Sequence, residues 1–374
     1  MKGLLISIFD YKNYNENLAN EIDQEMRLLS DSAGIDILNE ERIIIKYRNI
    51  SPKTFFTKGK IDQIKEYILN VQQNTLIQNK TEENDFVLIF NMDFSPTQIR
   101  NCEEIFERKI ITKTQLIYQI FLARASSKPA KIQLELANLK YMKSRLAGSY
   151  ENFDRIRGGI GLKGPGETKL EVDRRTISKK IKQLEEELKK IEKHLVIQVK
   201  NREDQFVFSL AGYTNAGKTS LLNCLTKANQ YSDNALFTTV NVKSRSLYLG
   251  NGKKIIISDT IGFIRELPIH LVESFKTTLL EIKYSSLIGI VVDSSSPFYK
   301  EHIEIVENML ETLKCENIKK IIIFNKIDLL TENELENFKI YNDFDFKNQN
   351  IDVFYISTKT KEGIDLLLSY LKSI

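Results

Sequence analysis

Short apolar runs alternate with amphipathic helical patterns over the first 130 residues of the chain. Apolar runs at 4–9, 42–47, 86–90 and 109–111 predict strands, and apolar residues at helical spacing predict helices over 17–29, 61–69 and 114–124. Ser95 followed by Pro96 predicts a further helix start, because serine caps helices and proline fits the first helical position. Lys58-Gly59-Lys60 is interpreted as a turn before a helix rather than as an anion contact. Together these elements predict a small α/β domain.

Long helical periodicity replaces this alternation from Lys131 onwards. Ile132, Leu136 and Leu139 share one helical face. From Leu170 to Leu195, apolar residues follow a nearly unbroken spacing of three or four positions, with charged residues between them. We therefore expect two long helices that pack as an antiparallel hairpin. Residues 157–168 between them contain five glycines and one proline, and this composition predicts a mobile loop that can fit against another surface.

A glycine-rich loop follows the apolar run 206–211 and precedes a helical pattern at 221–225. It reads Gly212-Tyr213-Thr214-Asn215-Ala216-Gly217-Lys218-Thr219. In a G-x-x-x-x-G-K-[ST] loop, backbone N–H groups and the dipole of the following helix bind phosphate. We expect Lys218 to bridge the β- and γ-phosphates, Thr219 to bind Mg²⁺ through its hydroxyl, and Ser220 to complete the site. Taken alone, the loop could instead be a turn that only joins a strand to a helix.

Three further motifs follow in the order that is typical of GTP-binding proteins. Asp259-Thr260-Ile261-Gly262 ends a strand pattern, and we expect Asp259 to reach Mg²⁺ through water and Gly262 to offer its N–H to the γ-phosphate. In Asn325-Lys326-Ile327-Asp328, the Asp328 carboxylate can accept hydrogen bonds from guanine N1–H and the 2-amino group, which adenine lacks, and Lys326 can cover the base. Ser357-Thr358-Lys359 follows another strand pattern and is expected to contact the guanine oxygen through a backbone N–H. An isolated N-K-x-D would be interpreted as a turn or a helix cap, but the four motifs support one another.

The predicted fold class is α/β, in three parts. These are an N-terminal α/β domain at 1–130, an antiparallel long-helix hairpin with its glycine-rich loop at 131–204, and a P-loop GTPase domain with a mostly parallel sheet at 205–374. We expect GTP or GDP as the nucleotide, with Mg²⁺.

Composition adds few constraints. The 374 residues are 42% hydrophobic and 28% charged, as in ordinary globular proteins, and the net charge of +4 is small. No apolar run approaches the roughly 20 residues that cross a bilayer, so we expect no membrane span and a cytoplasmic monomer, with peripheral membrane association left open. Neither disulfides nor zinc are expected. The cysteines stand alone with no C-x-x-C spacing, and the histidines form no ligand cluster; these residues are Cys102, Cys224, Cys315, His194, His270 and His302.

Positive charge is concentrated in the predicted hairpin. Between Lys131 and Lys182 there are 13 lysines or arginines and 6 acidic residues, so this region carries +7. Such residues bind phosphate backbones, which makes RNA the natural partner, although a solvated helix face is the alternative. The candidates for RNA contact flank the glycine-rich loop and are Arg155, Arg157, Lys163, Lys169, Arg174 and Arg175.

Several of these stretches together resemble the HflX family of GTPases. They are Gly158-Gly-Ile-Gly-Leu-Lys-Gly-Pro-Gly-Glu-Thr-Lys-Leu-Glu-Val-Asp-Arg-Arg175, Gly-Tyr-Thr-Asn-Ala-Gly-Lys from Gly212, and Asp-Thr-Ile-Gly-Phe-Ile-Arg-Glu-Leu-Pro from Asp259. The resemblance implies a ribosome-associated GTPase that binds the large (50S) subunit, with the hairpin facing ribosomal RNA. It further implies that the protein splits ribosomes or rescues stalled ones.

The first switch also carries the resemblance. Leu236-Phe237-Thr238-Thr239 is similar to the family motif, and on that basis Phe237 and Thr238 are assigned to the nucleotide site and Thr239 to Mg²⁺. The sequence departs from the family at Val240-Asn241-Val242, and also at Thr112-Lys113-Thr114-Gln115, which puts any polar role of the latter segment in doubt.

The predicted catalytic residues are Lys218, Thr239 and Gly262, which would neutralise charge on the γ-phosphate. Phe263 follows Gly262 where a glutamine usually orients the attacking water, so hydrolysis should be slow alone and stimulated by a partner. Two switches, at 232–239 and 259–267, would be held by the γ-phosphate and released after hydrolysis. The alternatives are a G protein that acts on another RNA or an RNA-modifying partner, and an RNA-binding protein with a structural nucleotide.

Overall fold

The computed structural model describes residues 1–77, 86–154, 169–200, 205–226, 236–237, 243–250, 253–267, 271 and 280–374. The chain divides into two compact units, and each is described by itself. The first unit comprises Met1–Ala123 and Leu134–Leu184, and the second comprises Arg124–Gln133 and Glu185–Ile374. The domain boundaries expected after residues 130 and 204 stay a prediction.

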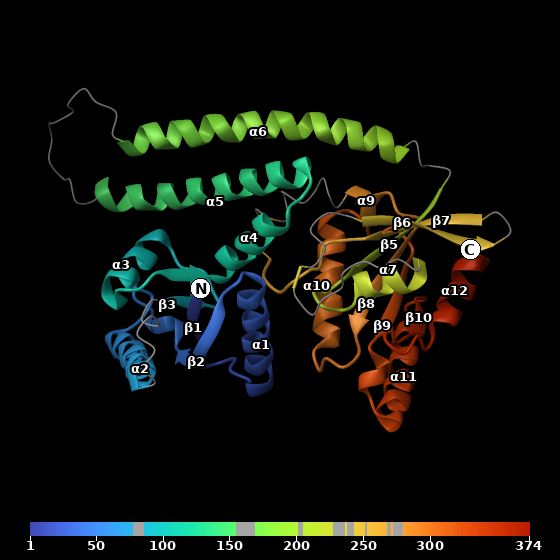
Figure 1. Ribbon diagram of the computed structural model, residues 1–374, viewed down its shortest axis with the longest axis horizontal. Coiled ribbons are helices and arrows are strands. Elements are labelled where there is room, and N and C mark those ends of the chain that lie inside the picture. The colour runs from blue at the N-terminus through green and yellow to red at the C-terminus, as the bar shows by residue number, and fades with distance from the viewer. Residues whose placement is uncertain are drawn as a thin grey trace. The chain divides into compact units, whose positions relative to one another are not determined.

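A four-stranded parallel sheet forms the centre of the first unit, in the strand order β2-β1-β3-β4 (Figure 1). Every residue of β3 is buried, as expected for an inner strand of a parallel sheet. Phe86, Leu88 and Phe90 of β3 join one hydrophobic core, whose other members include Leu4, Ile43, Phe56 and Phe106. The elements are β1 (Lys2–Asp10), α1 (Glu16–Ser32), β2 (Asp36–Ile45), η1 (Tyr47–Asn49), α2 (Lys58–Ile77), β3 (Phe86–Phe90), α3 (Pro96–Phe106), β4 (Ile110–Thr112) and α4 (Lys113–Arg124).

These elements confirm the predicted α/β alternation, with two differences at element ends. Lys58-Gly59-Lys60 forms the first turn of α2 rather than a turn before it, because the Thr57 carbonyl accepts hydrogen bonds from the N–H groups of Lys60 and Ile61 at 3.0 Å. Strand β2 begins at Asp36 rather than at residue 42, because it pairs with β1 along its whole length. The helix start at Ser95 is confirmed, since its side chain accepts from the Gln98 N–H in a capping box.

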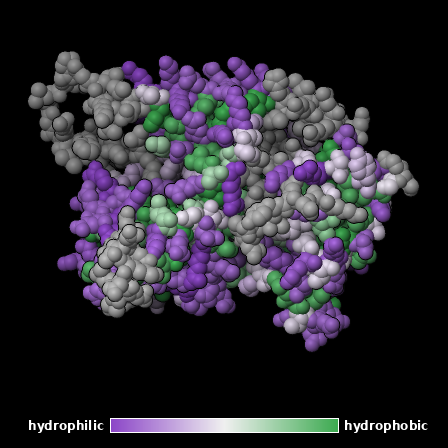
Figure 2. Space-filling view, in the orientation of Figure 1, coloured by the Kyte–Doolittle hydropathy of each residue, from purple (hydrophilic) through white to green (hydrophobic). Residues whose placement is uncertain are grey.

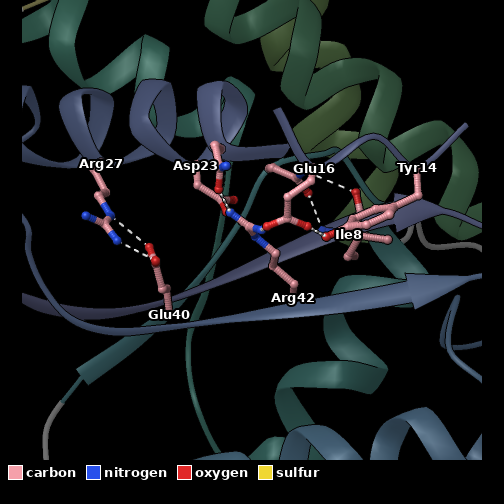
Figure 3. Close-up of polar contacts among 9 residues, drawn as sticks. Ile8, Tyr14, Glu16, Asp23, Arg27, Glu40 and Arg42 are labelled. Atoms are coloured by element: carbon pink, nitrogen blue, oxygen red, sulfur yellow. Dashed lines mark hydrogen bonds and ion pairs between the residues drawn. The ribbon is translucent and has the colours of Figure 1, made fainter. Parts of the chain in front are cut away.

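An ionic cluster joins α1 to β2 (Figure 3). Arg42 on β2 donates through Nε to Asp23 Oδ2 at 2.6 Å and through Nη1 to Glu16. Asp23 is only 3% exposed, so its carboxylate requires a cationic partner to offset the loss of hydration. Arg27 and Glu40 form a second ion pair between the same two elements. The polar residues of β2 are therefore used to attach a helix to the sheet.

Two long helices, α5 (Lys128–Asp154) and α6 (Lys169–Lys200), confirm the predicted hairpin. They run antiparallel, because Lys180 pairs with Glu135 and Lys128 pairs with Glu187. Ile181, Leu184 and Leu188 share the buried face of α6. Hydrophilic side chains line the upper edge of the view in Figure 2, above the middle of this helix. The glycine-rich stretch between the helices lies outside the described residues from 155 to 168.

A six-stranded sheet with the order β10-β9-β8-β5-β7-β6 forms the second unit. All pairs are parallel except β6 with β7, which confirms the mostly parallel sheet. The carboxyl ends of parallel strands meet at one edge of such a sheet, where α/β proteins bind ligands. The elements are β5 (Phe206–Gly212), α7 (Lys218–Thr226), β6 (Lys243–Gly250), β7 (Lys253–Asp259), α9 (Leu280–Lys283), β8 (Leu287–Asp293), α10 (Tyr299–Thr312), β9 (Lys320–Asn325), η2 (Ile327–Leu329), α11 (Glu332–Lys347), β10 (Asp352–Tyr355) and α12 (Ile364–Ser373).

Within the described ranges, none of the helices combines the length and the apolar character that a membrane crossing requires.

Candidate nucleotide-binding site

The glycine-rich loop connects the end of β5 to the start of α7, as its motif predicts. Two of its positions accept only glycine. A Cβ at Gly212 would lie 2.3 Å from the Val291 carbonyl oxygen, and a Cβ at Gly217, where φ is +96°, would lie 2.2 Å from Asn325 Nδ2. The backbone can therefore pass close to neighbouring strands and turn its N–H groups towards a bound anion.

Lys218 is the cation of this loop, and its side chain folds back over it. Its Nζ donates hydrogen bonds to the carbonyl oxygens of Gly212 at 3.0 Å and Tyr213 at 2.7 Å. Burial lowers the pKa of Lys218 to about 8, while the nearby Asp259 carboxylate opposes part of this shift. A poorly hydrated ammonium group of this kind gains strongly from an incoming phosphate.

Thr219 and Asp259 lie together at the start of α7 and the end of β7. The Thr219 hydroxyl donates to Asp259 Oδ2 at 2.7 Å, and the two residues are 7% and 0% exposed. A hydroxyl and a carboxylate are oxygen ligands of the type that Mg²⁺ prefers, so the donor set fits this ion. In the described part of the chain, no group of three or more His, Cys, Asp or Glu side chains could hold a metal, so Mg²⁺ would also need phosphate oxygens. Thr238 and Thr239 lie outside the described residues, so their roles stay predictions.

Leu236 and Phe237 represent the first switch among the described residues. Both are buried, and Phe237 adopts a positive φ of 54°. Arg124, the last residue of α4, donates through Nη1 to the Leu236 carbonyl oxygen. This contact could not be predicted from the sequence, because nothing local connects Arg124 to a segment more than one hundred positions later.

The second switch begins directly after β7. Gly262 packs closely on the phosphate loop, because a Cβ there would lie 3.0 Å from Thr214 Cγ2 and 3.1 Å from Lys218 Nζ. The side chains of Thr260 and Ile261 are buried, and the Thr260 hydroxyl donates to the Leu210 carbonyl oxygen at 2.7 Å. Any nucleotide contact of these two residues would therefore involve the backbone. Phe263 is 1% exposed, so its ring belongs to the core.

The base-reading motifs are hydrogen-bonded to the phosphate loop. Asn325 is fully buried; its Nδ2 donates to the Ala216 carbonyl oxygen at 2.9 Å, and its Oδ1 accepts from the Thr358 N–H at 3.1 Å. Asp328 Oδ1 accepts from the Ser357 hydroxyl at 2.6 Å. The structure thus brings three predicted motifs, far apart in sequence, to one place.

Two further residues complete this end of the site. Lys326 Nζ donates to Asp293 Oδ2 at 2.6 Å, and this second carboxylate was not among the predicted site residues. The available signal was its position, since Asp293 ends an apolar strand as Asp259 does. Lys359 follows the Ser357 turn, where its backbone N–H donates to the Ser357 hydroxyl at 3.2 Å.

The candidate RNA contacts are only partly described. Arg174 and Arg175 are exposed on α6, and Lys169 is the first residue of that helix. Arg155, Arg157 and Lys163 lie outside the described residues. Their contact with RNA stays a prediction.

Known families and proteins match most of the chain. Three families match successive parts: "GTP-binding GTPase N-terminal" over residues 20–122, "GTP-binding GTPase Middle Region" over 124–202, and "50S ribosome-binding GTPase" over 207–326. GTPase HflX of Caldanaerobacter subterraneus subsp. tengcongensis is 38% identical over 369 residues, which cover 98% of this chain and 79% of that protein. GTPase HflX of Escherichia coli is 35% identical over 351 residues, or 93% and 78% of the two chains.

A solved structure shares the fold. The crystal structure of SsGBP in complex with GDP matches 100% of this chain and 98% of its own, with a TM-score of 0.54 and 23% sequence identity. At this level of identity, the likeness concerns the fold alone. The sequence matches are closer and extend over nearly the full chain. On this evidence, the chain belongs to the HflX family of GTPases.

Proposed function

We propose that this chain binds the large ribosomal subunit and that GTP binding and hydrolysis control its association with the ribosome. As a family member the chain is a GTPase, and GTP and GDP are its nucleotides. The observation that carries the ribosomal part is the match of residues 207–326 to the family described as 50S ribosome-binding GTPase. Splitting of ribosomes, or rescue of stalled ones, is the specific task that we propose.

The site supports hydrolysis mainly by neutralising negative charge. The Lys218 ammonium group lies beside Gly262, so both can act on the γ-phosphate, where charge develops during transfer to water. Thr219 and Asp259 would hold Mg²⁺ together with the phosphates, and the ion would supply further charge neutralisation. The buried Phe263 ring has no hydrogen-bonding group, so this chain needs a partner to orient the attacking water.

Specificity for guanine would come from Asp328, which is held by Ser357. An Asp328→Asn variant should lose GTP hydrolysis by at least about ten-fold and gain activity on xanthosine triphosphate, because the amide N–H can donate to the 2-oxygen of xanthine. Rates for the two nucleotides in the variant and the wild type test this assignment. Unchanged preference for GTP would contradict it.

The ribosomal proposal is tested by GTP and ATP hydrolysis, measured with the chain alone and with 50S subunits or 70S ribosomes over a series of salt concentrations. We expect a slow rate alone and a large GTP-specific stimulation that falls with salt, because phosphate contacts release counterions. A rate that ribosomes leave unchanged would contradict the proposal. The chain would then be either a G protein that acts on another RNA or an RNA-modifying partner, or an RNA-binding protein with a structural nucleotide.

The hairpin is tested by reversing two exposed charges. Arg174→Glu with Arg175→Glu should reduce the stimulation of hydrolysis by ribosomes. It should also make the slope of log affinity against log salt concentration shallower by about one to two, because up to two phosphate contacts are lost. Lys347→Glu, at an exposed position on α11, is the matched control and should retain stimulation.

Ribosome splitting is tested by light scattering of 70S ribosomes mixed with the protein and GTP. Splitting is refuted if the ribosomes stay intact at saturating protein.

A further inference from the structure

The second switch is paired directly with the phosphate loop. The Thr214 N–H donates to the Phe263 carbonyl oxygen at 2.7 Å, and the Phe263 N–H donates to the Gly212 carbonyl oxygen at 3.1 Å. These two bonds form a parallel bridge between Tyr213 and Phe263, which extends the β-sheet beyond the ends of β5 and β7. The backbone on the carboxyl side of Gly262 is therefore held in a defined position.

The Tyr213 side chain adds a second attachment to the same segment. Its hydroxyl accepts a hydrogen bond from the Arg265 backbone N–H at 2.9 Å. Its ring stacks on His302 of α10, with centroids 3.9 Å apart and planes 12° apart, and both residues are 7% exposed. Tyr213 was predicted to bind nucleotide, but its side chain contacts the second switch and α10.

Arg265 connects the segment to α10 a second time. Its Nη2 lies 3.0 Å from Glu301 Oε2, one residue before His302. The Glu301 side chain is half exposed, so this ion pair adds little to the free energy of folding and serves mainly to orient the arginine. The second switch is thus bound by the phosphate loop and by one face of α10.

These contacts determine where Gly262 lies. Gly262 directly precedes Phe263, which is paired with Tyr213, and a Cβ on Gly262 would lie 3.1 Å from Lys218 Nζ. A segment held in this way presents Gly262 beside the ammonium group that would contact the γ-phosphate. Release of the Tyr213 and Arg265 contacts would let Gly262 move away from it.

We propose that Tyr213, Arg265, Glu301 and His302 form a latch that holds the second switch in the position from which Gly262 binds the γ-phosphate. Tyr213 is then a positioning residue for GTP hydrolysis that acts through Gly262. The proposal rests on the role proposed above for Gly262, and it does not depend on ribosome binding. The experiment is therefore done without ribosomes, so that the two proposals can fail separately.

The latch is tested by comparing affinities for GDP and for GMPPNP, a GTP analogue that is not hydrolysed, together with single-turnover GTP hydrolysis. Tyr213→Phe removes only the hydroxyl and should lower GMPPNP affinity by about five-fold, because the second switch would then hold Gly262 beside Lys218 in only part of the molecules. Glu301→Gln should act in the same direction. Both variants should hydrolyse GTP more slowly and keep GDP affinity within about two-fold, since GDP has no γ-phosphate.

Glu304→Gln is the matched control, because Glu304 is an exposed glutamate on the same helix. It should behave as the wild type in all three measurements. Equal losses of GDP and GMPPNP affinity would overturn the proposal, since Tyr213 would then only support the loop. Faster hydrolysis in the variants, or no change in any measurement, would overturn it as well. Unaltered GMPPNP affinity in Gly262→Ala would refute the role of Gly262 and the latch with it.

Discussion

Substitution of Asn325 is expected to disconnect the base-reading motifs from the phosphate loop. Asn325→Ala removes the Nδ2 donor of the Ala216 carbonyl and the Oδ1 acceptor of the Thr358 N–H. It leaves the Asn325 backbone carbonyl, which accepts from the Ser294 N–H, in place. Each lost bond leaves a polar group without this partner in a buried site and costs about 1–3 kcal/mol, so we expect a total near 3 kcal/mol. If the whole cost falls on nucleotide binding, GDP affinity falls by about 100-fold.

The assay is a fluorescence titration of GDP, with urea unfolding in parallel to divide the loss between binding and stability. Asn337→Ala is the control, because Asn337 is exposed on α11. Asn325→Asp should weaken binding at least as strongly as Asn325→Ala, since a carboxylate cannot donate to the Ala216 carbonyl. GDP affinity and unfolding free energy that both stay near the wild-type values in Asn325→Ala would refute this role of Asn325.

Three further perturbations have defined outcomes. Gly217→Ala should weaken GDP binding by at least about ten-fold, because its methyl group would lie 2.2 Å from Asn325 Nδ2 at a positive φ; near-normal affinity in the same titration would contradict this. The pKa of Lys218, about 8 instead of 10.5, means that the unfolded chain holds this proton more tightly. In nucleotide-free protein, the unfolding free energy should therefore rise between about pH 8 and pH 10.5, by roughly 3 kcal/mol more than in the Lys218→Met variant. If urea denaturation gives the same pH dependence for both proteins, the lowered pKa of Lys218 is refuted. Arg42→Met should lower the unfolding free energy of the first unit by about 3 kcal/mol, because it leaves the buried Asp23 carboxylate without its cation; a loss under about 1 kcal/mol by urea denaturation would contradict this.

The sequence determined those features that depend on local pattern. The apolar run of β3 and the Ser95-Pro96 helix start are short-range signals, and the structure has both elements where they were predicted. The four nucleotide motifs were recognisable because phosphate and guanine recognition require particular residue types at fixed spacing. The helical periodicity of α5 and α6 likewise predicted the hairpin, since each helix has one apolar face to bury.

The tertiary structure decided the features that depend on strand order and side-chain direction. Asn325 meets Ala216 across 109 positions because β9, β8 and β5 are neighbours in the sheet, and the same order brings Asp293 beside Lys326. The sequence placed Tyr213 in the phosphate loop, but it could not show that the ring points to α10 and the second switch. A motif specifies where the backbone runs, whereas the direction of each side chain follows from the elements that pack around it.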